Sequence, residues 1–130
     1  MSQRTVLFVQ RGSFEPAFQV ATLAVTAVAM GEGVMVVFAF EALERWVRGD
    51  FGSPANDRER AEWERSQALG LPAPTPLLHE ARALGARFVA CGTTMKVCGF
   101  TEKEVEGRLD EVMGLPSLWR WASGARVLTF

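Results

Sequence analysis

The fold of this chain is decided by residues 5–40, TVLFVQRGSFEPAFQVATLAVTAVAMGEGVMVVFAF. A short apolar, β-branched run at 5–9 predicts a buried strand, and a second run at 34–40 predicts another. Between the two runs, Ser13 is placed to cap a helix that has Pro16 in its first turn. Strand, helix and strand within about 35 residues form a βαβ unit, for which we expect a right-handed crossover.

The rest of the chain repeats this alternation. Helices are predicted at 41–48, 57–69, 77–84, 92–99 and 116–122, and strands at 87–90, 108–113 and 125–130. The pattern predicts a three-layer α/β/α sandwich with about five mainly parallel strands, built as a single domain over residues 1–130.

Residues 50–74 differ from their surroundings and are predicted to be a charged insertion. In its predicted helix, Ala61, Ala68 and Leu69 form the only apolar stripe, and Trp63 lies away from that stripe. The insertion is therefore either a solvated segment with one exposed tryptophan or a lid or subunit contact anchored by that side chain.

Composition excludes several classes of protein. The 130 residues are 48% hydrophobic, with 14 basic and 15 acidic side chains, which argues against disorder and against nucleic-acid binding. One His and two Cys are too few for a closed zinc site, and two Cys favour a reducing, cytoplasmic compartment. Residues 1–10 do not form a signal peptide, and the longest apolar stretch, 17–30, is too short to span a membrane.

Cys91 is the strongest candidate for chemistry, because it follows a predicted buried strand and precedes a predicted helix. Backbone N–H groups at a helix start stabilise a thiolate. Gly92 allows close backbone approach, and the hydroxyls of Thr93 and Thr94 are possible donors. The alternative is an inert buried cysteine.

Two other side chains are weaker candidates. Cys98 is expected to share the core side of its helix with Met95, about 10 Å from Cys91, too far for a disulfide. His79, the only histidine, is expected to face solvent rather than to pair with Cys91.

The carboxyl ends of parallel strands are the usual ligand site of such sheets. At this edge, Gly12 and Ser13 could hold an anion at a helix start. Glu41 follows the second strand, and it is either an acid or base in this cleft or a solvated charge.

Four stretches resemble the DsrE/DsrF-like family, which includes the TusD-type sulfur-relay proteins. They are residues 6–9 with the alanine-rich helix ending at 29–31, residues 36–43, residues 84–100 around Cys91, and residues 125–130. The resemblance implies a flavodoxin-like domain, assembly into homo- or hetero-oligomers, and sulfur carried as a persulfide on Cys91. The insertion at 50–74 has no counterpart in the family pattern.

The leading hypothesis is therefore a cytoplasmic sulfur carrier or sulfurtransferase that needs no metal or other cofactor. Its partners would be further copies of the chain and sulfur donor and acceptor proteins, with no nucleic acid and no membrane. One alternative is a non-catalytic oligomeric module that binds a small anion or nucleotide. Another is a thiol redox sensor.

Overall fold

The structure is a computed structural model that describes residues 3–130. Met1 and Ser2, the first two residues of the segment that was compared with a signal peptide, lie outside the described residues. Within these residues the chain forms one five-stranded parallel sheet in the order β4-β3-β2-β1-β5. The strands are β1 (Arg4–Val9), β2 (Gly33–Phe38), β3 (Arg87–Cys91), β4 (Glu111–Met113) and β5 (Arg126–Thr129). The helices are α1 (Phe14–Ala29), α2 (Phe40–Arg48), α3 (Asp57–Ala68), α4 (Pro74–Ala83), α5 (Gly92–Val97), α6 (Glu102–Val105) and α7 (Leu115–Ala122). The predicted α/β fold with parallel strands is confirmed.

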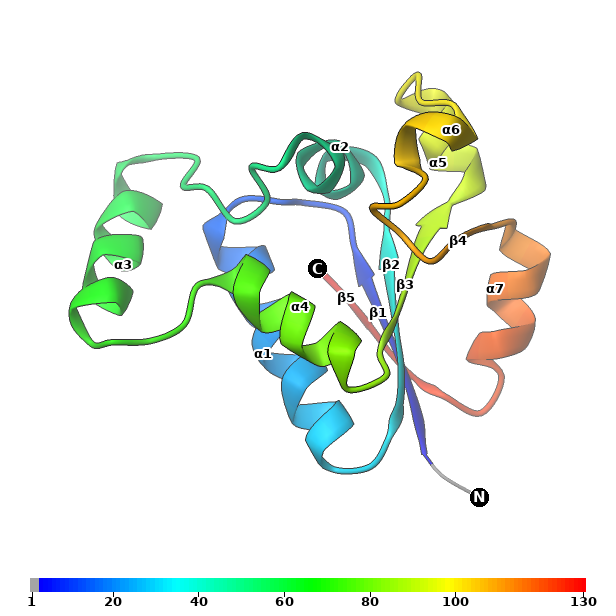
Figure 1. The fold of residues 1–130 in the computed structure, drawn as a ribbon, viewed down its shortest axis with the longest axis horizontal. Coiled ribbons are helices and arrows are strands. Elements are labelled where there is room, and N and C mark those ends of the chain that lie inside the picture. The colour runs from blue at the N-terminus through cyan, green and yellow to red at the C-terminus, as the bar shows by residue number, and fades with distance from the viewer. Residues whose placement is uncertain (1–2) are drawn as a thin grey trace.

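The strand order explains how the helices are divided between the two faces of the sheet. From β1 to β4 the chain steps in one direction, and right-handed crossovers therefore put the intervening helices on one face. The last step returns from β4 to the far side of β1, so α7 lies on the opposite face (Figure 1). The helical layer on this second face therefore consists of α7 alone, which has eight residues.

The two faces carry two separate hydrophobic cores. The larger core packs α1, α2 and α4 on the sheet, and Trp46 belongs to it as predicted. At its centre Phe38 is fully buried and stacks on Trp46 with ring centroids 5.0 Å apart. The smaller core, under α7, contains Val89, Cys91 and Leu118.

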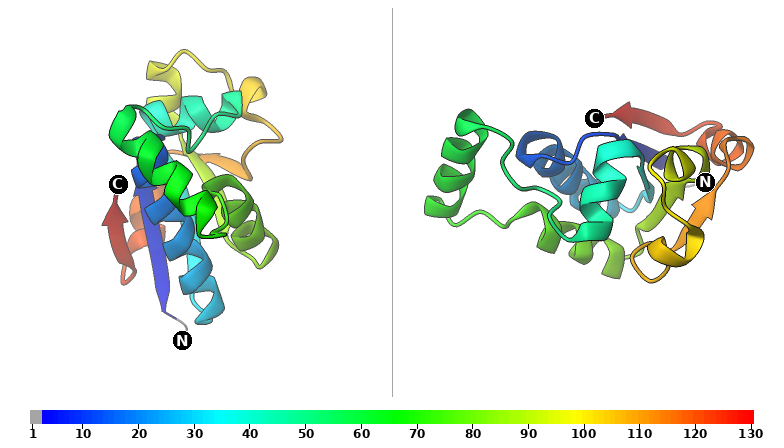
Figure 2. Two further views of the ribbon diagram at one scale, coloured as in Figure 1. Left: turned by 90° about the vertical axis from the view of Figure 1, so that its left-hand side faces the viewer. Right: turned by 90° about the horizontal axis from the view of Figure 1, so that it is seen from above.

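The insertion differs from the prediction in which side of α3 packs. Helix α3 projects at one end of the molecule, near the start of α1 (Figures 1 and 2). The predicted apolar stripe of α3 and its C-cap, Ala61, Ala68 and Leu69, is exposed, whereas Glu59 is buried and Trp63 is half-buried. The prediction of an exposed Trp63 is wrong, because α3 packs through a glutamate that bonds to α1 and not through its apolar residues.

The second strand is shorter than predicted. It ends at Phe38, and Phe40 begins α2 with a positive φ of 50°. Periodicity alone does not separate the last apolar residues of a strand from the first of a helix. None of the helices within residues 3–130 is long and apolar enough to cross a membrane.

Candidate functional site

The candidate site lies at the carboxyl edge of the sheet, between β3 and β4. After β3 the chain continues on the α1 face, and after β4 it continues on the α7 face. Neighbouring strands whose connections leave on opposite faces create a crevice, and ligands of open parallel sheets bind in such a crevice. In this chain Cys91 ends β3 directly beside Met113, which ends β4.

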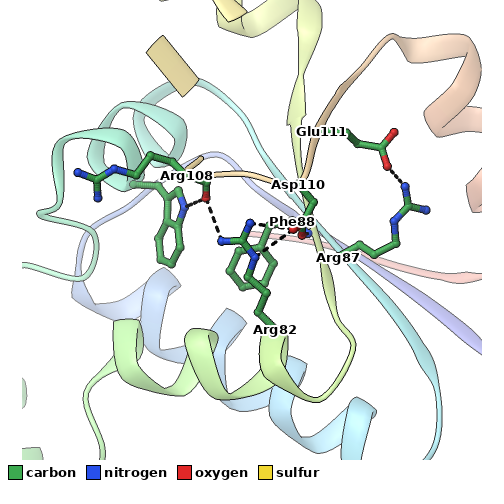
Figure 3. A network of polar contacts seen from close by, with 7 residues as sticks. Arg82, Arg87, Phe88, Arg108, Asp110 and Glu111 are labelled. Carbon is green, nitrogen blue, oxygen red and sulfur yellow. Dashed lines mark hydrogen bonds and ion pairs between the residues drawn. The ribbon is translucent and has the colours of Figure 1, made fainter. Parts of the chain in front are cut away.

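A polar network holds β4 beside β3 (Figure 3). The Asp110 carboxylate accepts hydrogen bonds from the Phe88 N–H at 2.6 Å and from the Arg82 guanidinium at 2.7 Å. An ion pair between Arg87 and Glu111 links the two strands directly. These contacts fix a strand of only three residues and thereby set the position of the crevice.

Cys91 is 5% exposed and its side chain belongs to the smaller core. It occupies the N-cap position of α5, but its sulfur makes no capping hydrogen bond. The thiol is therefore placed next to the helix start, as the sequence predicts, but on the side covered by α7.

The residues after Cys91 contribute in different ways. Gly92 lies against β4, where an added Cβ would sit 3.4 Å from the Met113 carbonyl oxygen. Thr93 is exposed. The Thr94 hydroxyl donates to the Cys91 carbonyl oxygen at 3.2 Å, so in this structure it stabilises the turn and does not contact the sulfur.

Cys98 lies at the other end of α5. It is the C-cap residue and is half-buried, whereas Met95 is fully buried, so the predicted core position holds for Met95 and only in part for Cys98. Burial raises the pKa of the Cys98 thiol, and the nearby Glu44 carboxylate raises it further. Cys98 is thus disfavoured as the thiolate at neutral pH.

The predicted cleft residues Gly12, Ser13 and Glu41 do come together after β1. The Gly12 N–H donates to Oε1 of Glu41 at 2.9 Å. Gly12 is needed here because an added Cβ would sit 3.2 Å from the Ala42 Cα and 2.8 Å from a side-chain carbon of Arg45. Ser13 occupies the N-cap position of α1, as predicted, but its hydroxyl makes no capping hydrogen bond and donates to Glu59 instead.

Sequence reasoning missed Glu59, which reaches this end of the sheet from the insertion. Its Oε2 accepts from the Ser13 hydroxyl at 3.0 Å and from the Glu15 N–H at 2.8 Å. Its Oε1 accepts from the Ala55 N–H at 2.8 Å. The Glu59 carboxylate therefore occupies the position at the start of α1 where the sequence predicts that an anion could bind.

The pKa of Glu59 reflects two opposing effects. Burial by itself raises it, but the hydrogen bonds from Glu15, Ala55 and Ser13 outweigh burial, and the pKa lies below its usual value. Glu59 is ionised at neutral pH. No signal in the sequence marks it, since it stands among exposed charges on a mixed-charge helix.

His79 is separate from Cys91. It is exposed, as predicted, and its ring lies 5.3 Å from Trp46 in the larger core, on the other face of the sheet from Cys91. The two residues therefore do not form a nucleophile pair. Across residues 3–130 no cluster of three or more His, Cys, Asp or Glu side chains is arranged to hold a metal ion.

These features define a single-sheet α/β protein with a cysteine at the point where the connections of the sheet change face. No family model and no curated protein matches the sequence. The solved structures that share the fold include two that are described as proteins of unknown function. MTH1491 from Methanobacterium thermoautotrophicum is 14% identical, with a TM-score of 0.57 over 99% of this chain and 100% of that chain. BT1422 from Bacteroides thetaiotaomicron is 11% identical, with a TM-score of 0.64 over 98% of this chain and 95% of that chain. At these identities the likeness shows the fold alone.

Proposed function

We propose that the protein is a cytoplasmic sulfur carrier that holds a persulfide on Cys91. The observation that carries this proposal is the place of Cys91 at the end of β3, beside the end of β4, at the crevice where the connections change face. Cys91 is also the N-cap residue of α5, so it lies next to the N–H groups at the start of that helix. Because Cys91 is 5% exposed, the site suits a group as small as one added sulfur atom.

The transfer is balanced without a cofactor. The Cys91 thiolate attacks the outer sulfur of a donor persulfide, the sulfur–sulfur bond of the donor breaks, and the donor leaves as a thiolate. A persulfide now stands on Cys91. An acceptor thiolate then attacks its outer sulfur, and Cys91 leaves as the thiolate with which the cycle began.

Two observations favour this proposal over the alternatives. A redox sensor needs a resolving thiol, and α5 separates Cys98 from Cys91 by about 10 Å, beyond the roughly 7 Å between Cα atoms that a disulfide spans. An anion-binding module at the end of β1 needs free donors. There the N–H groups of Gly12 and Glu15 already bond to the carboxylates of Glu41 and Glu59.

The test is the intact mass of the folded protein after incubation with a persulfide donor. We expect wild type and Cys98→Ser to gain one sulfur atom, and reductant to remove it, because Cys91 carries it. Cys91→Ser should gain none. Sulfur loading that depends on Cys98, or thiols that react only after the protein is unfolded, would contradict the proposal.

We also propose that the chain forms a homo-oligomer through the α7 face. An apolar groove there is lined by residues that include Phe8, Leu118 and Val127, and Trp119 beside them is 82% exposed. All four residues of the edge strand β5 are exposed as well. An exposed apolar patch next to an unpaired strand edge favours association.

The oligomer is tested by sedimentation velocity at micromolar concentration. Wild type should sediment above the 14.3 kDa of one chain, and Trp119→Glu should shift it to the monomer, because it puts a charge in the groove. The matched control is Trp63→Glu, which changes the half-buried tryptophan of α3 and should leave the sedimented mass of the folded protein unchanged. A wild-type monomer at this concentration refutes the proposal.

A further inference from the structure

A second pocket lies between α2 and α4, on the face of the sheet opposite the Cys91 thiol. Its volume is about 240 Å³. Its lining includes the side chains of Trp46, Phe51, Thr75, His79, Arg82 and Arg108. They come from separate segments of the chain, so the pocket is a product of tertiary packing.

One wall of the pocket is aromatic and rigid. Trp46 and Phe51 are 5% and 6% exposed, with ring centroids 5.6 Å apart. The Trp46 Nε1–H donates to the Arg108 carbonyl oxygen at 2.8 Å, which fixes the orientation of the indole. The His79 ring lies 5.3 Å from the indole at a tilt of 42°. Such a wall suits a flat ring, which gains contact area without ordering flexible side chains.

The rest of the lining is polar and, where charged, basic. Among the described residues that line the pocket, none is Asp or Glu. The Arg82 guanidinium is already bonded to Asp110 and to the Arg108 carbonyl oxygen. The Arg108 side chain extends away from Arg82 (Figure 3), and across residues 3–130 it takes part in no ion pair. A guanidinium without a carboxylate partner, in a lining that also contains the His79 imidazole, favours an anionic group.

We propose that this pocket binds a small aromatic carboxylate, with its ring against Trp46 and Phe51 and its carboxylate toward Arg108 and His79. The Thr75 hydroxyl donates to the Phe51 carbonyl oxygen at 3.1 Å, which holds the loop that forms the aromatic wall. A volume of 240 Å³ lies below the range of about 300–1,000 Å³ for drug-sized ligands. The ligand class is therefore one ring or two fused rings with a short acidic substituent. Binding here is independent of sulfur chemistry at Cys91.

The experiment compares two probes of equal shape, indole-3-acetate and the neutral indole-3-acetamide, by isothermal titration calorimetry with the full chain. We expect the acid to bind about tenfold more tightly, the effect of one charge-assisted hydrogen bond. Arg108→Gln should abolish this preference and His79→Gln should reduce it. Both side chains are exposed, so neither change should unfold the protein.

The matched control is Arg60→Gln, which removes an exposed arginine on α3 and should leave both affinities unchanged. The indole N–H resonance of Trp46 locates the bound probe, because it should shift on titration while those of the other three tryptophans stay in place. Three results overturn the proposal. They are equal affinity for acid and amide, no binding of either, and a preference that survives Arg108→Gln.

Discussion

Replacing Glu59 with glutamine should lower the free energy of unfolding by about 2–3 kcal/mol at neutral pH. The carboxylate is 2% exposed and accepts three hydrogen bonds, from Ser13, Glu15 and Ala55. A glutamine keeps one accepting oxygen, and its NH₂ group faces donors in place of the other. The change leaves at least one buried donor unsatisfied and removes a negative charge from the start of α1. Chemical denaturation of both proteins measures the difference.

The matched control is Glu62→Gln, one turn further along α3. The pKa of Glu62 is raised, because it shares a hydrogen bond with the Glu15 carboxylate and is desolvated and repelled there. Its ionised form is therefore disfavoured in the folded state, and removing the charge should leave stability unchanged or raise it at neutral pH. A loss at Glu62 as large as at Glu59 would show that α3 is held by its charges in general.

The Glu59 effect should also depend on pH. The pKa of Glu59 is lowered on folding, so its contribution is fully present above the unfolded-state pKa of about 4.3 and is lost as pH falls through the folded-state pKa. The difference between wild type and Glu59→Gln should therefore be constant from neutral pH down to about pH 5 and shrink below it. A difference that persists in acid would contradict a role for the carboxylate charge.

Replacing Phe38 with alanine should cost about 3–5 kcal/mol of stability, the usual range for a buried phenylalanine. Phe38 is fully buried, and its ring centroid lies 5.0 Å from that of Trp46, 5.7 Å from Phe51 and 5.5 Å from Phe88. These three rings belong to α2, β3 and the loop at Phe51. They cannot fill the cavity left by the missing phenyl ring without moving the sheet. For a domain whose total stability is about 5–15 kcal/mol, the loss is large.

The control for Phe38 is Phe40→Ala, two residues further along. Phe40 is 43% exposed, and alanine meets a comparable backbone strain at its positive φ, so the change should stay within about 1 kcal/mol. Equal losses at the two positions, measured by urea denaturation, would show that the aromatic cluster around Phe38 is not the centre of the core.

Much of the sheet could be predicted because the signals are local. Residues 5–9 and 87–90 are short apolar runs bounded by Gly or polar residues, and their short length and β-branched and aromatic content favour strands over helices. The same reasoning places Cys91 at the end of a strand and before a helix, as observed. The prediction was wrong where a buried run passes directly into a helix, because the strand predicted to reach Phe40 ends at Phe38 and Phe40 begins α2.

The sequence by itself therefore determined the α/β class, the parallel strands and the strand-end position of Cys91, since each depends on residues that are neighbours along the chain. Only the tertiary structure decided what Glu59 and Trp119 do. Glu59 is an ordinary helix charge until α3 packs on the start of α1, where free N–H groups make its burial favourable. Trp119 is left exposed because the return of the chain from β4 to β5 puts a single short helix on the second face. Both outcomes depend on contacts between distant segments, which no local pattern encodes.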